Sequence, residues 1–173
     1  MSIIVSTSTA LVRCFLCGQK GRFDLSKICA FFGHRDTPYT ITLENQLEQT
    51  VRQLISQGVD EFWCCEQGTF DWMARSLMLK LKKEFHHITI CYICAYRCSK
   101  SKQQWLEEHF DLIYPDEVAN GLLKFAIPRR NSYIINNADI IICYVNRKSG
   151  GAYRAMQFAL RKGKTIINLT SQQ

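Results

Sequence analysis

Two patterns of apolar residues alternate along most of the chain. Residues 27–32 (Lys-Ile-Cys-Ala-Phe-Phe) form a short, almost continuously apolar run, which is typical of a strand buried on both faces. Residues 42–57 instead place an apolar side chain every three or four positions, as an amphipathic helix requires. Thr42 is a suitable N-cap for this helix, and Gly58 is a suitable C-terminal stop.

The same alternation continues through the rest of the sequence. It predicts further strands at residues 61–65, 88–95, 112–114, 139–145 and 165–169. It predicts further helices at residues 70–85, 101–109, 129–137 and 150–162, and a loop with a helical turn at 115–125. Strands that alternate with helices in this way pair in parallel through right-handed crossovers. The expected fold class is therefore α/β: a Rossmann-like, doubly wound, mostly parallel sheet with helices on both faces.

The length and the pattern predict one folded domain. At 173 residues the chain has the usual size of a single domain, and the alternating elements place that domain at residues 26–173. Residues 1–25 show no clear periodicity, so they are expected to be an N-terminal extension of doubtful order. Three interpretations of this extension stay open: a disordered tail, a small appended hairpin, or a translation start assigned too far upstream.

The charge of the chain favours anionic ligands only in a general way. There are 22 Lys and Arg against 15 Asp and Glu, a formal net charge of +7, and the basic residues are dispersed. This excess is too small to indicate a nucleic-acid-binding surface by itself. No run approaches the roughly 18 apolar residues of a membrane span, so no membrane association is expected.

Nine cysteines raise the question of disulfide bonds or a metal site. Their number is odd, and several lie within apolar runs, where free cysteine packs like a small apolar residue. Because no convincing export signal is present, this indicates reduced thiols and a cytoplasmic location. The spacings Cys14/Cys17 and Cys91/Cys94 do not predict a metal site, because the second pair lies in a strand whose side chains alternate between faces.

Three loops that follow predicted strands are candidates for binding, because ligands of open α/β sheets bind beyond the carboxyl ends of the strands. In the first loop, Gly33 lets the backbone come close to a ligand, while His34 and Arg35 offer donors to an anion. The alternative is an ordinary solvated turn, and the residues of this loop alone do not decide between the two.

In the second loop, Glu66, Gln67 and Gly68 precede a helix. The start of a helix presents free N–H groups and the positive end of the helix dipole, which suits an anionic ligand. Asp71 lies in the first turn of that helix. It is suited either to capping the helix or to binding a ribose hydroxyl.

In the third loop, Gly150 and Gly151 follow a buried strand and precede a helix, which fits a phosphate cradle. Upstream, Arg129 and Arg130 stand beside Asn131 at the start of another helix, where guanidinium groups could hold phosphates. A solvated basic turn is the alternative. The chain has neither a Walker A sequence nor Gly-x-Gly-x-x-Gly, which disfavours ATP hydrolysis and NAD, and no cofactor is predicted.

These stretches, taken together, resemble the YpsA-like branch of the SLOG superfamily, a group named for its kinship with the DNA-processing protein DprA and the LOG phosphoribohydrolases. The resemblance runs in family order from about residue 27 to residue 169. The stretches that carry it are Cys29–Arg35, Gln67–Asp71, Arg130-Asn131, the strand from Asp139, Gly150–Ala152 and Gly163–Asn168. The resemblance implies a Rossmann-like domain whose Gly-His-Arg and Gly-Gly loops face a nucleotide-derived small molecule.

Some residues depart from the pattern of this family. Cys65 stands where the family tends to have glycine, Glu66 replaces an often neutral residue, and Asn136 stands where aspartate is common. In the LOG hydrolases a catalytic glutamate follows the paired glycines, and Gln157 holds the corresponding position here. Glutamine cannot act as a general base, so LOG-type phosphoribohydrolysis is not expected.

The favoured function is binding of a nucleotide or nucleotide derivative, with no assured catalytic activity. A homo-oligomer is compatible with this fold class, by analogy only. Phosphate is expected near Gly33, Arg35, Gly150 and Gly151, and ribose or base near Gln67 and Asp71.

Two other functions stay open. One is hydrolysis of an N-glycosidic or phosphate bond, which requires the acid and base groups of His34, Glu66 and Asp71 to converge at one crevice. The other, less favoured, is single-stranded DNA binding by analogy with DprA, in which exposed aromatic side chains stack on bases. The candidates for stacking are Trp63, Trp72 and Trp105.

Overall fold

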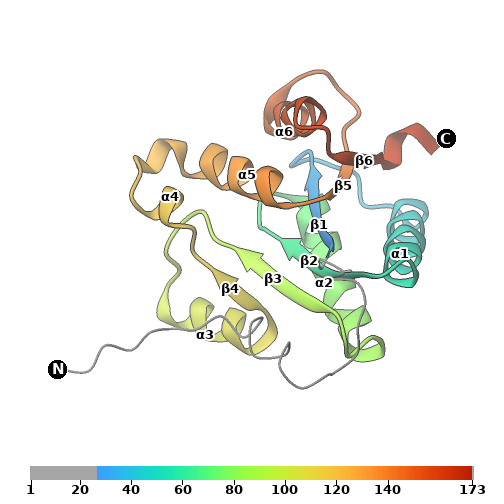
Figure 1. Ribbon diagram of the computed structural model, residues 1–173, viewed down its shortest axis with the longest axis horizontal. Coiled ribbons are helices and arrows are strands. Elements are labelled where there is room, and N and C mark those ends of the chain that lie inside the picture. Colours follow the sequence, from blue (N-terminus) through green and yellow to red (C-terminus); the bar gives the residue numbers. More distant parts are fainter. Residues whose placement is uncertain (1–26, 173) are drawn as a thin grey trace, which may run out of the picture.

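Six parallel strands form the centre of the structure (Figure 1). The computed structural model describes residues 27–172, and the predicted extension over residues 1–25 lies outside them. The strands are β1 (Lys27–Gly33), β2 (Val59–Cys64), β3 (Thr89–Ile93), β4 (Asp111–Ile113), β5 (Ile140–Tyr144) and β6 (Thr165–Asn168). Their order in the sheet is β4-β3-β2-β1-β5-β6, and each neighbouring pair is parallel. The predicted α/β fold class is confirmed.

Helices cover both faces of this sheet. They are α1 (Ile41–Ser56), α2 (Thr69–Glu84), α3 (Lys100–His109), α4 (Asp116–Ala119), α5 (Ala126–Asn137) and α6 (Gly150–Arg161), with 3-10 turns η2 (Leu123–Phe125) and η3 (Leu169–Gln172). Side chains of α1, α2 and α3 share one hydrophobic core, and those of α5 and α6 share a second. This division follows from right-handed crossovers. Strands β1 to β4 are added in one direction along the sheet, and β5 and β6 are added in the other direction from β1, so the helices of the two halves lie on opposite faces.

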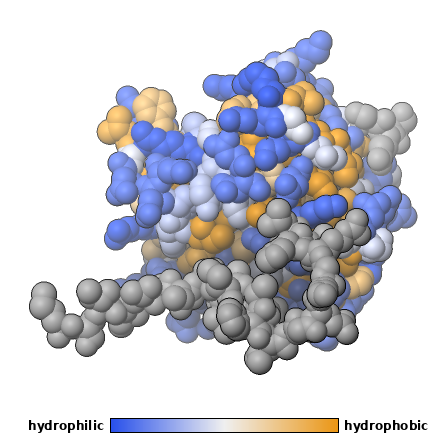
Figure 2. Space-filling view, viewed as in Figure 1, coloured by the Kyte–Doolittle hydropathy of each residue, from blue (hydrophilic) through white to orange (hydrophobic). Residues whose placement is uncertain are grey.

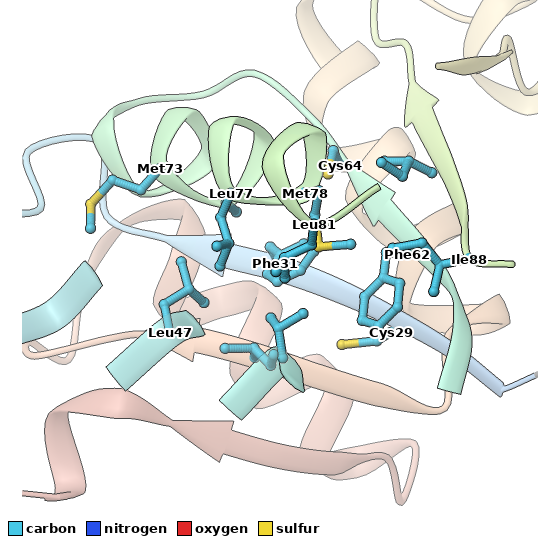
Figure 3. Close-up of a cluster of buried hydrophobic side chains, with 14 of the residues drawn as sticks. Cys29, Phe31, Leu47, Phe62, Cys64, Met73, Leu77, Met78, Leu81 and Ile88 are labelled. Atoms are coloured by element: carbon cyan, nitrogen blue, oxygen red, sulfur yellow. The ribbon is translucent and has the colours of Figure 1, made fainter. Parts of the chain in front are cut away.

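The larger core lies between the sheet and helices α1 and α2 (Figure 3). The rings of Phe31 on β1 and Phe62 on β2 have centroids 6.4 Å apart. Leu47 from α1 and Met78 and Leu81 from α2 join the same cluster, and all five side chains are almost fully shielded from water. Truncating one of them to alanine would therefore cost about 2–5 kcal/mol. This core holds β1 and β2 in place beneath the loops that follow them.

Helices α1, α2 and α3 begin one residue earlier than predicted, and α5 begins three residues earlier. Thr40 is the N-cap of α1, rather than Thr42, and its Oγ1 accepts a hydrogen bond of 3.2 Å from the backbone N–H of Leu43. Helix α5 begins at Ala126, earlier than predicted. Pro128 lies in its first turn, where a helix tolerates a residue without an N–H group.

Cysteine side chains contribute to both cores. The seven cysteines in the described part of the chain are free, and all of them except Cys98 are buried. Cys91 belongs to the core beneath α5 and α6, whereas Cys94 belongs to the core beneath α1, α2 and α3. Their side chains thus lie on opposite faces of the sheet. The other C-x-x-C pair, Cys14 and Cys17, lies outside the described residues.

One of the apolar areas on the face shown in Figure 2 lies at the corner where α4 meets α5. Leu122 and Leu123 are 62% and 74% exposed there, and Phe125 is also exposed. Among residues 27–172, no helix has both the length and the apolar character needed to cross a membrane.

Candidate functional site

The carboxyl ends of β1 and β5 lie next to each other at the centre of the sheet. From β1 the chain continues to β2 on one side, while β5 pairs with β1 on the other. Helices α1 and α6, which follow these two strands, lie on opposite faces, so their loops diverge and leave a crevice. One backbone hydrogen bond of 3.3 Å, from the N–H of His34 to the carbonyl oxygen of Tyr144, links the end of β5 to the first loop.

A cavity of about 280 Å³ occupies this crevice. Every predicted ligand-binding residue except Gly68 lies in its wall. The wall consists of Phe32, Gly33, His34, Arg35, Gln67, Asp71, Ile127, Arg130, Asn131, Arg147, Gly150, Gly151 and Ala152. The structure therefore brings together the loops after β1, β2 and β5 with the starts of α2, α5 and α6.

Gly68 shapes the site without lying in its wall. Its φ is +141°, and a Cβ atom there would stand 2.3 Å from the Cα atom of Arg35. The next residue, Thr69, donates its backbone N–H to the carbonyl oxygen of Arg35 at 3.0 Å. Gly33 also permits close packing, because a Cβ atom at this position would stand 2.3 Å from the Cβ of Phe70. These close approaches hold the first two loops against each other.

The start of α6 presents backbone N–H groups at the cavity. Ser149 occupies the N-cap position, but its side chain forms no capping hydrogen bond, so the first N–H groups of the helix lack that acceptor. Gly150 has φ +85°, a left-handed conformation that suits glycine. A Cβ atom at Gly151 would meet no atom within 4 Å. The backbone here is therefore open to an anion, which helix N-termini bind readily.

Arg130 is a buried cation in the wall of the cavity. Its side chain is only 2% exposed, and its Nε and Nη2 donate to Oδ1 of Asn131 at 3.2 and 2.8 Å. None of the ion pairs within residues 27–172 involves Arg130. Arg35, in contrast, is exposed, and its Nη2 lies 3.5 Å from Oε1 of Gln67.

Arg147 is a site residue that the sequence analysis missed. Its guanidinium donates two hydrogen bonds, of 2.9 and 2.8 Å, to the carboxylate of Asp36, and this pair joins the loop after β5 to the loop after β1. The available signal was its place in a polar segment between a predicted strand and Gly150. Arg129 does not reach the cavity; its guanidinium packs against Gly121, where a Cβ atom would stand 1.2 Å from Nη1.

His34 and Asp71 have shifted pKa values because both side chains are buried, 4% and 5% exposed. Burial and the positive charge of Arg147 lower the pKa of His34, so its ring is neutral at pH 7. Its Nε2 has no hydrogen-bond partner within the described region. Burial raises the pKa of Asp71, while the charge of Arg130 and a hydrogen bond of 3.2 Å from the Cys65 thiol act in the opposite direction.

Glu66 lies outside the cavity that holds His34 and Asp71. Its Oε2 accepts a hydrogen bond of 2.6 Å from the hydroxyl of Tyr92 and pairs with Nζ of Lys102. Burial opposes the ionisation of Glu66, but these two partners outweigh it and lower its pKa. Glu66 instead lines a second cavity, of about 420 Å³. The three candidate acid and base groups are therefore not brought together at one point.

The candidate stacking tryptophans differ in exposure. Trp63 is 4% exposed and stacks on Tyr133 with 5.6 Å between ring centroids, so it cannot stack on a base as it stands. Trp72 on α2 and Trp105 on α3 are exposed, but neither lies in the cavity wall. Trp72 contacts Tyr39 edge to face at 5.8 Å.

The chemistry of the cavity favours an anionic ligand. Its wall holds the guanidiniums of Arg35, Arg130 and Arg147 and the uncapped start of α6, against one buried carboxylate, Asp71. Asp36 neutralises Arg147 from outside the wall. Within residues 27–172, no group of three His, Cys, Asp or Glu side chains is placed to hold a metal ion.

No family model matches the chain, and no curated protein matches it. Among solved structures, the chain is similar to the X-ray structure of DNA processing protein A (DprA) from Streptococcus pneumoniae, with 16% sequence identity and a TM-score of 0.58. The match covers 82% of this chain and 49% of the DprA chain, so this chain spans about half the length of DprA. At this level of identity the likeness concerns the fold alone. The two proteins share a Rossmann-like α/β fold, the fold that the SLOG resemblance predicts, while the YpsA-like branch stays a prediction.

Proposed function

We propose that this chain binds the phosphate-bearing part of a nucleotide or nucleotide derivative in the cavity between β1 and β5. Arg130 carries the proposal, because its buried guanidinium has a neutral amide partner and no ion pair within the described part of the chain. The one carboxylate in the cavity wall, Asp71, interacts with Arg130 without forming an ion pair, and burial disfavours its ionisation. A bound anion would therefore offset much of the cost of burying the Arg130 charge. The start of α6 in the same wall adds the backbone donors that phosphate groups favour.

In the proposed arrangement, phosphate lies against Arg130, between Arg35 and Gly151, and ribose lies near Gln67. The side-chain amide of Gln67 can both donate and accept hydrogen bonds, as contact with a ribose hydroxyl requires. Asp71 is less suited to this role, because its Oδ2 already accepts a hydrogen bond from Cys65. Turnover is not part of the proposal, since Glu66 is engaged by Tyr92 and Lys102 outside this cavity.

Thermal unfolding of the full chain tests the proposal. The ligands are nucleoside mono-, di- and triphosphates, cyclic nucleotides and ADP-ribose. A ligand present at 100 times its Kd should add about 2.7 kcal/mol to the free energy of unfolding, which gives a clear rise in Tm. Arg35→Ala and Gly151→Val should each reduce this rise. Arg161→Ala, at the far end of α6, is the matched control and should not. A folded protein whose Tm no ligand raises would contradict the proposal.

A second candidate function is binding of single-stranded nucleic acid. The exposed pair Tyr39 and Trp72, on the loop after β1 and the start of α2, supports it, because aromatic rings can stack on bases. Binding to phosphates should weaken steeply as the salt concentration rises. Fluorescence titration of the full chain with an oligonucleotide at several salt concentrations tests this. Affinity that is unchanged by salt and by Trp72→Ala would exclude it.

We also propose that the chain belongs to the YpsA-like branch and that the protein is located in the cytosol. The stretch Phe31–Arg35 supports the branch, and the free cysteines of the described residues support a reducing compartment. Mass spectrometry of the protein from fractionated cells should find these cysteines as thiols in the cytosolic fraction. Recovery of the protein with disulfide-linked cysteines would contradict the cytosolic location.

A further inference from the structure

A second cavity continues from the first along the carboxyl edge of the sheet. It has a volume of about 420 Å³ and lies between the loop after β2, the loop after β3 and the start of α3. Two residues, Gln67 and Arg130, lie in the walls of both cavities. The two cavities are therefore adjacent spaces that meet at one neutral amide and one buried guanidinium.

Arg130 is the charged group at this junction. Its side chain is only 2% exposed, and it contacts Asn131 through Nε and Nη2. A guanidinium has five N–H donors and holds phosphate oxygens in pairs. Because Arg130 borders both cavities, it is placed to hold the middle of a ligand that extends into each of them.

The second cavity has the polar groups expected around a sugar. Glu66 and Lys102 form an ion pair in its wall, with the hydroxyl of Tyr92 bonded to the same carboxylate oxygen of Glu66. A carboxylate that follows the second strand of a doubly wound sheet is well placed to accept hydrogen bonds from ribose hydroxyls. Tyr96, which is 45% exposed, lies in the same wall and offers an aromatic face.

Resting on the function proposed above, we infer that the ligand has two parts: a diphosphate held at Arg130, with a ribose-bearing group on either side. One part occupies the cavity between β1 and β5, and the other extends past Gln67 toward Glu66 and Lys102. The cavity between β1 and β5, at about 280 Å³, is smaller than the roughly 300–1,000 Å³ common for sites of drug-sized ligands, so a ligand with two parts would extend into the second cavity. Here the diphosphate is held by a guanidinium from α5, in a chain without the Gly-x-Gly-x-x-Gly fingerprint.

Calorimetric titration of the full chain with ADP-ribose, AMP and ribose 5-phosphate tests this inference. ADP-ribose is expected to bind at least about tenfold more tightly than either half, a difference of roughly 1.4 kcal/mol. Glu66→Gln and Lys102→Ala should each reduce the affinity for ADP-ribose about tenfold, because they remove the contacts to its second ribose, and should leave the affinity for AMP unchanged. Lys100→Ala, an exposed change on the same helix but outside the cavity wall, is the matched control.

The outcomes separate the two proposals. Equal affinities for AMP and ADP-ribose, both insensitive to Glu66→Gln and Lys102→Ala, would overturn the two-part ligand and leave the phosphate site standing. Absence of binding by all three compounds to the folded protein would overturn both. Because Glu66 and Lys102 are exposed, these variants are expected to fold, and their unfolding curves verify this.

Discussion

Replacing Gly151 with alanine should change stability and ligand binding in opposite directions. Gly151 lies in the first turn of α6, and an added Cβ atom would meet no other atom within 4 Å. Alanine therefore fits without strain, restricts the unfolded chain and favours the helix, which together add about 0.4–1 kcal/mol to the free energy of unfolding. For a domain of this size, that gain raises the Tm by roughly 1–4 °C.

The same methyl group would stand between an incoming phosphate and the first N–H groups of α6. A charge-assisted hydrogen bond contributes about 1.5–3 kcal/mol. Losing one such bond reduces the affinity roughly ten- to a hundredfold. If phosphate binds where we propose, the ligand-free protein should become more stable and the complex weaker, because glycine leaves space there that a methyl group would fill.

Urea and thermal unfolding without ligand measure the first effect, and calorimetric titration with ADP-ribose measures the second. Gly150→Ala is the matched control, because its φ of +85° should make alanine there cost about 1–2 kcal/mol. A Gly151→Ala protein less stable than the wild type would refute the described start of α6. A more stable protein with unchanged affinity would refute the placement of the phosphate.

Three further changes test the loops around the cavity. Gly68→Ala should lower the free energy of unfolding by about 1–3 kcal/mol in urea, because its Cβ atom would meet the Cα of Arg35 at 2.3 Å; an unchanged urea midpoint would contradict this close approach. Asp36→Asn should change stability by less than about 1 kcal/mol but raise calorimetric affinity for the anion, since it releases Arg147; equal affinity would mean that Arg147 makes no contact with the ligand. His34→Gln should lessen the loss of stability on acidification. In the folded protein, burial and Arg147 lower the pKa of His34, whereas in the unfolded chain this histidine takes up a proton near the ordinary value of 6.5. The stability that a neutral His34 contributes is therefore lost as the pH falls through 6.5 toward the lowered pKa. If the urea midpoints of the variant and the wild type fall equally over this range, the effect is excluded.

The sequence was sufficient to predict the main elements and the loops that line the cavity, because both depend on local patterns. A strand buried on both faces requires a continuous apolar run, and β1 and β5 show such runs in the printed sequence. The carboxyl ends of parallel strands lie at one edge, so Gly33 and Gly150 were expected near each other. The order of the strands was not predictable, since alternating elements specify parallel pairing but not which strands are neighbours.

The directions of individual side chains could not be predicted from the sequence. Glu66 turns away from His34 because its partners are Tyr92 on β3 and Lys102 on α3, which is 36 residues further along the chain. Likewise, Arg147 donates hydrogen bonds to Asp36, which is 111 residues away in the sequence. Pairings of this kind depend on the assembled sheet, and no spacing in the sequence indicates them.

The pairing of β1 with β5 bears on how the protein is made. Phe31 lies opposite Ile142 in this pair, so a ribosome must synthesise the chain as far as β5, at residues 140–144, before β1 gains its second neighbour. Until then the apolar edge of β1 is open to pairing with other chains, a known route to aggregation. Four of the thirteen residues in the cavity wall follow β5, so they are also missing during that interval. Fragments from interrupted translation would therefore expose an unpaired apolar strand edge and lack part of the proposed phosphate site.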